Sequence, residues 1–212
     1  MTGSTGRTQE VLEFAAAMLL ALATIATAWS GYQASRWNGE EAEAFSRASA
    51  ARIESTKAAD LADSQTQLDV MTFVQWVDAY AQGQSKLANF YSRRFRAEFK
   101  PAVDAWIATR PLVNSDAPPT PFAMPEYHLR AHADAQRLDA EAESWSAKAQ
   151  ADVQLATNYV LCVVLFAGVL FFAGMSMRTR SAGPRRLLLG FGVVLFVGTV
   201  VWLATFPVSV SI

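Results

Sequence analysis

The sequence predicts an all-α fold: three transmembrane helices with a long helical-hairpin extracytoplasmic domain between the first and second. Two segments near the C-terminus, Tyr159–Met177 and Leu187–Phe206, are apolar and contain no charged residue. Each has about the ~20 residues that a helix needs to cross the hydrocarbon core of a bilayer. A third apolar segment, Val11–Trp29, lies near the N-terminus. We therefore expect transmembrane helices over residues 11–31, 156–177 and 187–206.

The turn between the last two apolar segments predicts the orientation of the chain. Residues 178–186 contain four arginines, and short arginine-rich turns stay in the cytoplasm. Residues 1–10 would then also be cytoplasmic, residues 32–155 extracytoplasmic, and residues 207–212 would emerge outside. The predicted localisation is the bacterial cytoplasmic (inner) membrane, multi-pass, with the N-terminus inside and the C-terminus outside.

The first apolar segment has two interpretations. It could be a signal peptide, because Ala26-Thr27-Ala28 has the small-x-small form of a cleavage site. However, residues 1–25, before this possible cleavage site, carry one arginine and two acids, whereas a signal peptide begins with net positive charge. Trp29, Tyr32 and Trp37 follow directly, which is typical of a retained helix leaving a membrane. We favour the retained transmembrane helix.

The segment from residue 32 to residue 110 is expected to be helical. It contains no proline before Pro101 and is rich in alanine, and its apolar residues recur at helical spacing. Gly83 is the predicted break between a first long helix and a second. Pro101 suits the first turn of a short third helix, Pro101–Thr109.

A loop is predicted over residues 110–125, where five prolines block both helix and central strand. A helix should resume near Glu126 and continue into the second span. Because both are rich in alanine, the helices over 32–66 and 126–157 are expected to pair antiparallel, with 68–109 packed at their far end.

The composition limits the classes of partner. The chain is 52% apolar and 17% charged, against ~25% charged in soluble domains. Residues 30–155 carry 17 of the 19 acidic residues but 13 of the 18 basic ones, so this segment is mildly acidic. A nucleic-acid-binding face would be basic, and we expect no nucleic-acid partner. The single cysteine, Cys162, lies within an apolar segment and can form no intrachain disulfide.

A polar cluster is expected where the first two spans leave the membrane. Arg36 and Glu40 are four residues apart, so they share one helix face. By the predicted topology, Asn158 and Tyr159 lie at the same depth on the second span. These four residues form our candidate site, a polar mouth able to bind a ligand or a lipid headgroup. The alternative, which we favour, is that they only anchor the helices at the interface.

His128 and His132, the only histidines, are spaced to share one face of the helix expected from Glu126. Such a pair can hold a metal if further ligands arrive. We favour two solvated side chains and expect no metal.

The segment Phe90–Lys100 is both aromatic and basic. It could dock on anionic lipid as an amphipathic helix. We favour aromatic side chains that fill the core and arginines that pair with acids such as Glu141 and Glu143.

Four stretches of the chain resemble a known family. They are Trp29–Glu40, Phe45–Arg52, Phe73–Tyr80 and Pro121–Tyr127. The chain is similar in these stretches to a widespread family of uncharacterised bacterial three-span membrane proteins with a helical extracytoplasmic insert. The resemblance implies the three spans and the insert, and it transfers no activity and no functional residue.

The predicted function is that of a non-enzymatic integral membrane protein: a scaffold, an accessory subunit or an envelope interaction module. Expected partners are membrane lipids and either further copies of the chain or another membrane protein. Small residues are expected to let the spans pack closely, including between copies of the chain: Ala17, Ala21, Thr24 and Ala28 on the first span and Gly190, Gly192 and Gly198 on the third. A small oligomeric channel or transporter component is the alternative, and an enzyme acting on lipid or envelope precursors ranks third. No nucleotide-binding loop, nucleophile triad or paired-cysteine motif is present, so we expect no catalytic residue and no cofactor.

Overall fold

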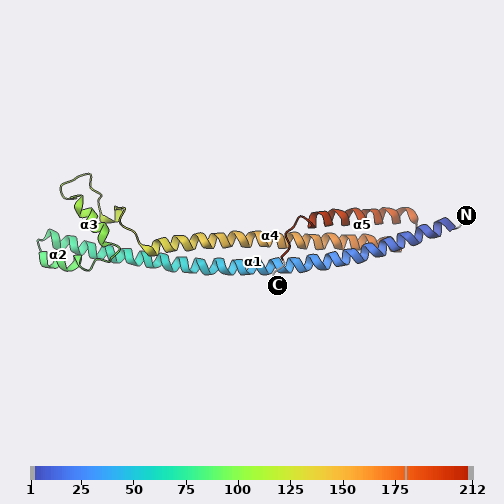
Figure 1. The fold of residues 1–212 in the computed structure, drawn as a ribbon, viewed down its shortest axis with the longest axis horizontal. Coiled ribbons are helices and arrows are strands. Elements are labelled where there is room, and N and C mark those ends of the chain that lie inside the picture. Colours follow the sequence, from blue (N-terminus) through green and yellow to red (C-terminus); the bar gives the residue numbers. More distant parts are fainter. Residues whose placement is uncertain (1–2, 180, 210–212) are drawn as a thin grey trace. The chain divides into compact units, whose positions relative to one another are not determined.

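The computed structural model describes residues 3–179 and 181–209, and within these ranges it is all-helical, with no strand. This confirms the predicted all-α class. Met1, Thr2, Arg180 and residues 210–212, which belong to the predicted segments 1–10, 178–186 and 207–212, lie outside the described residues. The helices are α1 (Gly3–Ala81), α2 (Ser85–Ser92), α3 (Lys100–Ala108), the 3₁₀ helix η1 (Pro121–Ala123), α4 (Arg130–Arg178) and α5 (Ala182–Leu203), drawn in Figure 1.

Three of these helices, α1, α4 and α5, are long and apolar enough to cross a membrane. The first two predicted spans, 11–31 and 156–177, lie inside α1 and α4. The third helix begins before Leu187 and ends before Phe206. Pro184 fits its first turn, and Pro207 disfavours helical geometry in the residue before it.

The chain divides into two compact units, each described by itself. We call residues 3–46 and 145–209 the span unit, because they contain the three apolar segments. We call residues 47–144 the aromatic unit. Within each unit α4 lies alongside α1 (Figure 1).

The core of the span unit is apolar and is built from all three helices. Gly192 of α5 packs closely, since a Cβ there would lie 3.3 Å from Leu19 Cδ2. The buried side chains are Ala16, Leu19 and Ala23 of α1, Cys162, Phe166, Val169 and Ala173 of α4, and Leu189 of α5.

The small residues singled out on the first span do not pack within a single copy of the chain. Ala17, Ala21, Thr24 and Ala28 are exposed, and the buried face of α1 includes Ala16 and Ala23 instead. Their predicted role in packing between copies stays a prediction.

In the aromatic unit, Gly83 ends the first long helix as predicted. Its φ of 71° lies in the left-handed region that glycine adopts at little cost. Pro101 occupies the first turn of α3, which also confirms the expected short helix. Two helical predictions fail: α2 ends at Ser92, so 93–99 form turns, and α4 begins at Arg130 rather than near Glu126.

An alanine seam joins α1 to α4 within the aromatic unit, as the predicted antiparallel pairing requires. The Ser55 hydroxyl donates a hydrogen bond to the Ala135 carbonyl at 2.9 Å, which fixes the register of the two helices. Alanine side chains at such a seam let the helix axes approach closely. The buried alanines are Ala48, Ala51 and Ala62 of α1 and Ala131, Ala135 and Ala142 of α4.

Beyond the seam, the aromatic unit has a core of aromatic rings. Phe99, with no exposed surface, lies at its centre and stacks on Phe122 with ring centroids 5.0 Å apart. The core is Phe73, Phe95, Phe99 and Val103, with Trp76, Trp106, Phe122 and Tyr127 packed against it. As expected, the aromatic side chains of Phe90–Lys100 contribute to this core through Phe95 and Phe99.

Candidate functional site

Three of the four residues of the predicted polar cluster contact residues outside the cluster. The Tyr159 hydroxyl, on a buried side chain, donates a hydrogen bond to the Pro207 carbonyl at 2.9 Å. Glu40 lies 3.6 Å from Lys148. Asn158 accepts a hydrogen bond from Gln154 of its own helix at 3.4 Å. Arg36 is half-buried and has an interaction partner.

Sequence reasoning missed the residue that ties this end of the span unit together. Gln33 has no exposed surface, accepts a hydrogen bond from the Ser209 N–H at 3.1 Å and donates one to the Ser209 carbonyl at 3.4 Å. Together with Tyr159, it holds the segment after α5 against α1 and α4. Gln33 lies within Trp29–Glu40, one of the stretches that carry the family resemblance, but that resemblance assigns no role to it and nothing in the local sequence indicates Ser209 as its partner.

An ion pair nearby also joins α1 to α4. Lys148 contacts Glu40, and it also binds Asp152 at 2.7 Å. The hydrogen bond to Asp152 raises the pKa of Lys148, and Glu40 acts in the same direction. Because their polar groups bind other parts of the same chain, Tyr159, Glu40 and Gln33 close this end of the unit rather than line an open mouth.

A second polar contact joins the start of α5 to α1, at the end of the span unit away from Gln33 and Tyr159. Arg185, one of the arginines of the predicted cytoplasmic turn, is buried and binds Glu13 through Nη1 at 3.2 Å. This pair connects the start of α5 to the first apolar segment of α1. A charge pair that is partly withdrawn from water constrains the two helices more than a surface pair does.

The aromatic unit contains a buried charge network. Asp69 has no exposed surface and binds Arg96 at 2.7 Å, and Arg96 binds Glu98 at 2.6 Å. The network is completed by the Tyr127 hydroxyl, which donates to Asp69 at 3.3 Å, and by Arg130, which binds Glu98 at 2.9 Å. Burial raises the pKa of the Asp69 carboxyl, although Arg96 and Tyr127 act in the opposite direction.

This network differs from the partners predicted for the arginines of Phe90–Lys100, which were acids such as Glu141 and Glu143. Arg96 pairs with Asp69 and Glu98, whereas Glu141 lies 3.9 Å from Arg137 of its own helix. The prediction failed because residues 93–99 form turns, which direct Arg96 toward α1 instead of toward a neighbouring helix face.

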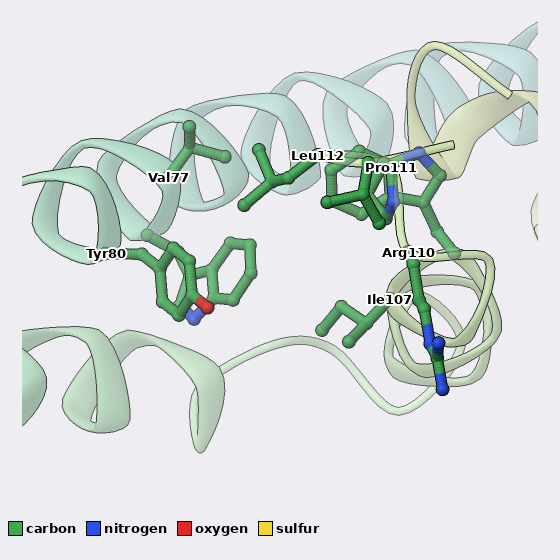
Figure 2. A pocket seen from close by; sticks show the side chains of 9 residues that line it. Val77, Tyr80, Ile107, Arg110, Pro111 and Leu112 are labelled. Atoms are coloured by element: carbon green, nitrogen blue, oxygen red, sulfur yellow. The ribbon is translucent and has the colours of Figure 1, made fainter. Parts of the chain in front are cut away.

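An apolar pocket of about 340 Å³ lies beside the aromatic core. In Figure 2, Tyr80, Ile107 and Leu112 approach the same space from three sides, and Arg110 extends along the edge beside Ile107. Its volume is at the lower end of the ~300–1,000 Å³ typical of small-molecule sites. The lining residues are Trp76, Val77 and Tyr80 of α1, Trp106 and Ile107 of α3, and Arg110, Pro111, Leu112 and Val113 of the loop that follows.

The loop that forms one wall is held in an unusual conformation. Arg110 has a φ of 55°, which is rare for a residue other than glycine, and its carbonyl accepts hydrogen bonds from the N–H groups of Val113 and Asn114. The turn leaves Leu112 and Val113 with 82% and 81% of their surface exposed. Large apolar side chains presented in this way mark binding surfaces.

The two histidines do not share a helix face. His128 precedes α4, and the His132 ring lies 3.1 Å from the Gln136 amide. Within the ranges the structure describes, no group of three or more histidine, cysteine, aspartate or glutamate side chains is placed to hold a metal ion.

No family model, curated protein or solved structure matches this chain. The family resemblance drawn from the sequence therefore stays a prediction.

Proposed function

We propose that the protein is a non-enzymatic integral membrane protein of the bacterial cytoplasmic membrane that acts as an envelope interaction module, serving as a scaffold or accessory subunit. The span unit anchors it, and the aromatic unit binds a partner or ligand. The observation that carries this proposal is the apolar pocket, with the exposed Leu112 and Val113 beside it. Exposed apolar surface of this kind is typical of a site that binds a partner or a ligand.

The outer surface of the span unit supports a location in lipid. Many large apolar side chains of this unit face outward, which is the arrangement expected of helices surrounded by lipid. Within the apolar segments, the most exposed are Val11, Phe14, Ile25, Val164, Phe171, Leu187, Phe191, Val194 and Val201.

The alternative function, an oligomeric channel or transporter component, would need a pore between copies of the chain. The cluster packed between α1, α4 and α5 in a single copy is apolar. A pore between copies would therefore have to be lined by other faces of these helices.

Topology is the first test. With residues 1–10 and 178–186 in the cytoplasm, a cysteine at Ser115 should react with a membrane-impermeant maleimide in intact cells, and one at Ser181 should react only after lysis. Both positions are exposed, so differences in labelling report the side of the membrane. Labelling at Ser181 but not at Ser115 would place the aromatic unit in the cytoplasm and contradict the proposed orientation.

Binding at the pocket is the second test. A photo-reactive amino acid at Leu112 should form an adduct of defined mass in intact cells, whereas the same group at Leu87 should not. Leu87 is a matched control because it is a partly exposed leucine of α2 that does not line the pocket. An Ile107→Trp change, which fills the pocket, should abolish the adduct. Equal adducts from both positions would show that Leu112 has no special role.

A further inference from the structure

The pocket of the aromatic unit also indicates what kind of molecule would occupy it. Two aromatic rings, Trp76 and Tyr80, stack with centroids 5.4 Å apart along one wall. Ile107 and Leu112 provide aliphatic surface on the other sides (Figure 2). A molecule that binds between these walls gains binding free energy mainly from the removal of apolar surface from water.

The pocket walls are poorly suited to a peptide. The indole N–H of Trp106, one of the few polar groups there, already donates a hydrogen bond to the Pro118 carbonyl at 2.7 Å. Apart from Arg110, the Tyr80 hydroxyl and the indole N–H groups of Trp76 and Trp106, the lining side chains are apolar. A peptide segment would bury backbone N–H and C=O groups without partners, which is costly, whereas a hydrocarbon chain carries no such groups.

The rim of the pocket carries a positive charge. Arg110 is the one charged residue among those lining the pocket, its side chain is exposed, and no carboxylate among the described residues forms a salt bridge with it. A guanidinium at the edge of an apolar pocket matches an oxyanion at the end of an apolar chain. A pocket of about 340 Å³ has room for one short chain, not for the two chains of a phospholipid.

From this combination we propose that the pocket binds a free single-chain amphiphile with an anionic end, of the fatty-acid type. The chain lies against Trp76, Tyr80 and Ile107, and the carboxylate lies at the rim beside Arg110. This inference rests on the proposed function, because it names the ligand of the same binding surface. It adds a ligand class and a specificity-determining residue, Arg110.

The test uses the full chain in phosphatidylcholine nanodiscs and dodecanoate with a photo-reactive group at its chain end. Adducts are located by mass spectrometry. We expect them on peptides containing residues 76–80 or 106–113, and we expect Ile107→Trp to abolish them while Leu87→Trp does not. Unlabelled dodecanoate should compete about tenfold better than dodecanol, as expected for a single charge-assisted contact.

Arg110→Asn tests the charge. Asparagine tolerates the left-handed backbone that Arg110 adopts, so the loop should keep its shape while the preference for dodecanoate over dodecanol disappears. Arg93→Asn is the matched control, since Arg93 is exposed in the same unit and does not line the pocket. Thermal unfolding of each variant establishes that the aromatic unit remains folded.

Three results would overturn the inference: adducts confined to the apolar segments of the span unit, equal competition by dodecanol and dodecanoate, or stronger competition by a diacyl phosphatidylglycerol. If dodecanoate fails to label the pocket but the group at Leu112 still forms its adduct in cells, only the ligand class is wrong. Failure of both experiments would remove the proposed function as well.

Discussion

Replacing Phe99 by alanine should destabilise the aromatic unit by about 3–5 kcal/mol, the range for removing a large buried aromatic side chain. Phe99 has no exposed surface and stacks on Phe122 with an angle of 8° between the rings. It also meets Phe95, Tyr127 and Phe73 edge-on, at centroid distances of 5.3, 5.7 and 6.2 Å. The cavity left behind is bordered by rigid rings that cannot collapse into it.

Hydrogen–deuterium exchange of the full chain in nanodiscs measures this effect unit by unit. Amides of α3 should exchange about a hundredfold faster or more, since ~1.4 kcal/mol corresponds to a factor of ten. Amides of α5, in the span unit, should be unchanged. The control is Phe90→Ala, because Phe90 is 47% exposed and its ring lies against Tyr91 and the Arg94 guanidinium, outside the aromatic core. Similar effects from both variants would mean that Phe99 is not the centre of the core.

The sequence predicted helices and spans well because those features are local. Helix formation in the two uncharged segments, the helix break at Gly83 and the helix start at Pro101 depend mainly on nearby residues. The structure has helices in both segments, a left-handed glycine at the break and a proline in the first turn of α3. Local patterns also indicated that Phe95 and Phe99 belong to a core.

Contacts between distant segments could not be predicted in the same way. Gln33 and Ser209 are 176 positions apart, and nothing in either local sequence marks them as partners. The partners of Arg96 depend on the turns at 93–99, which helix propensity did not reveal. The pocket depends on the left-handed Arg110, a conformation that few arginines adopt.

The second large effect is expected for Arg96→Ala, which should destabilise the aromatic unit by about 3–5 kcal/mol near pH 7, because it leaves the buried charge of Asp69 without its cation. The Asp69 side chain is 1% exposed and that of Arg96 25% exposed. Arg137→Ala should cost only about 0–1 kcal/mol, because Arg137 and its partner Asp134 are both more than half exposed. Adding Asp69→Asn to Arg96→Ala should recover much of the loss, since the unpaired charge is then gone.

The dependence on pH separates this explanation from simple loss of packing. Burial raises the pKa of Asp69, so its contribution to stability is fully present below the ordinary value of about 3.9 and is lost as the pH rises through the raised value. Arg96 lowers that pKa in the parent protein, and its removal should raise the pKa further. The difference in unfolding free energy between parent and Arg96→Ala should therefore shrink as the pH is lowered from 7 through the raised pKa of Asp69 in the variant, because the protonated carboxyl needs no cation. A difference that stays constant over this range, or one that persists unchanged in the Asp69→Asn background, would show that Arg96 acts through packing and not through the charge of Asp69.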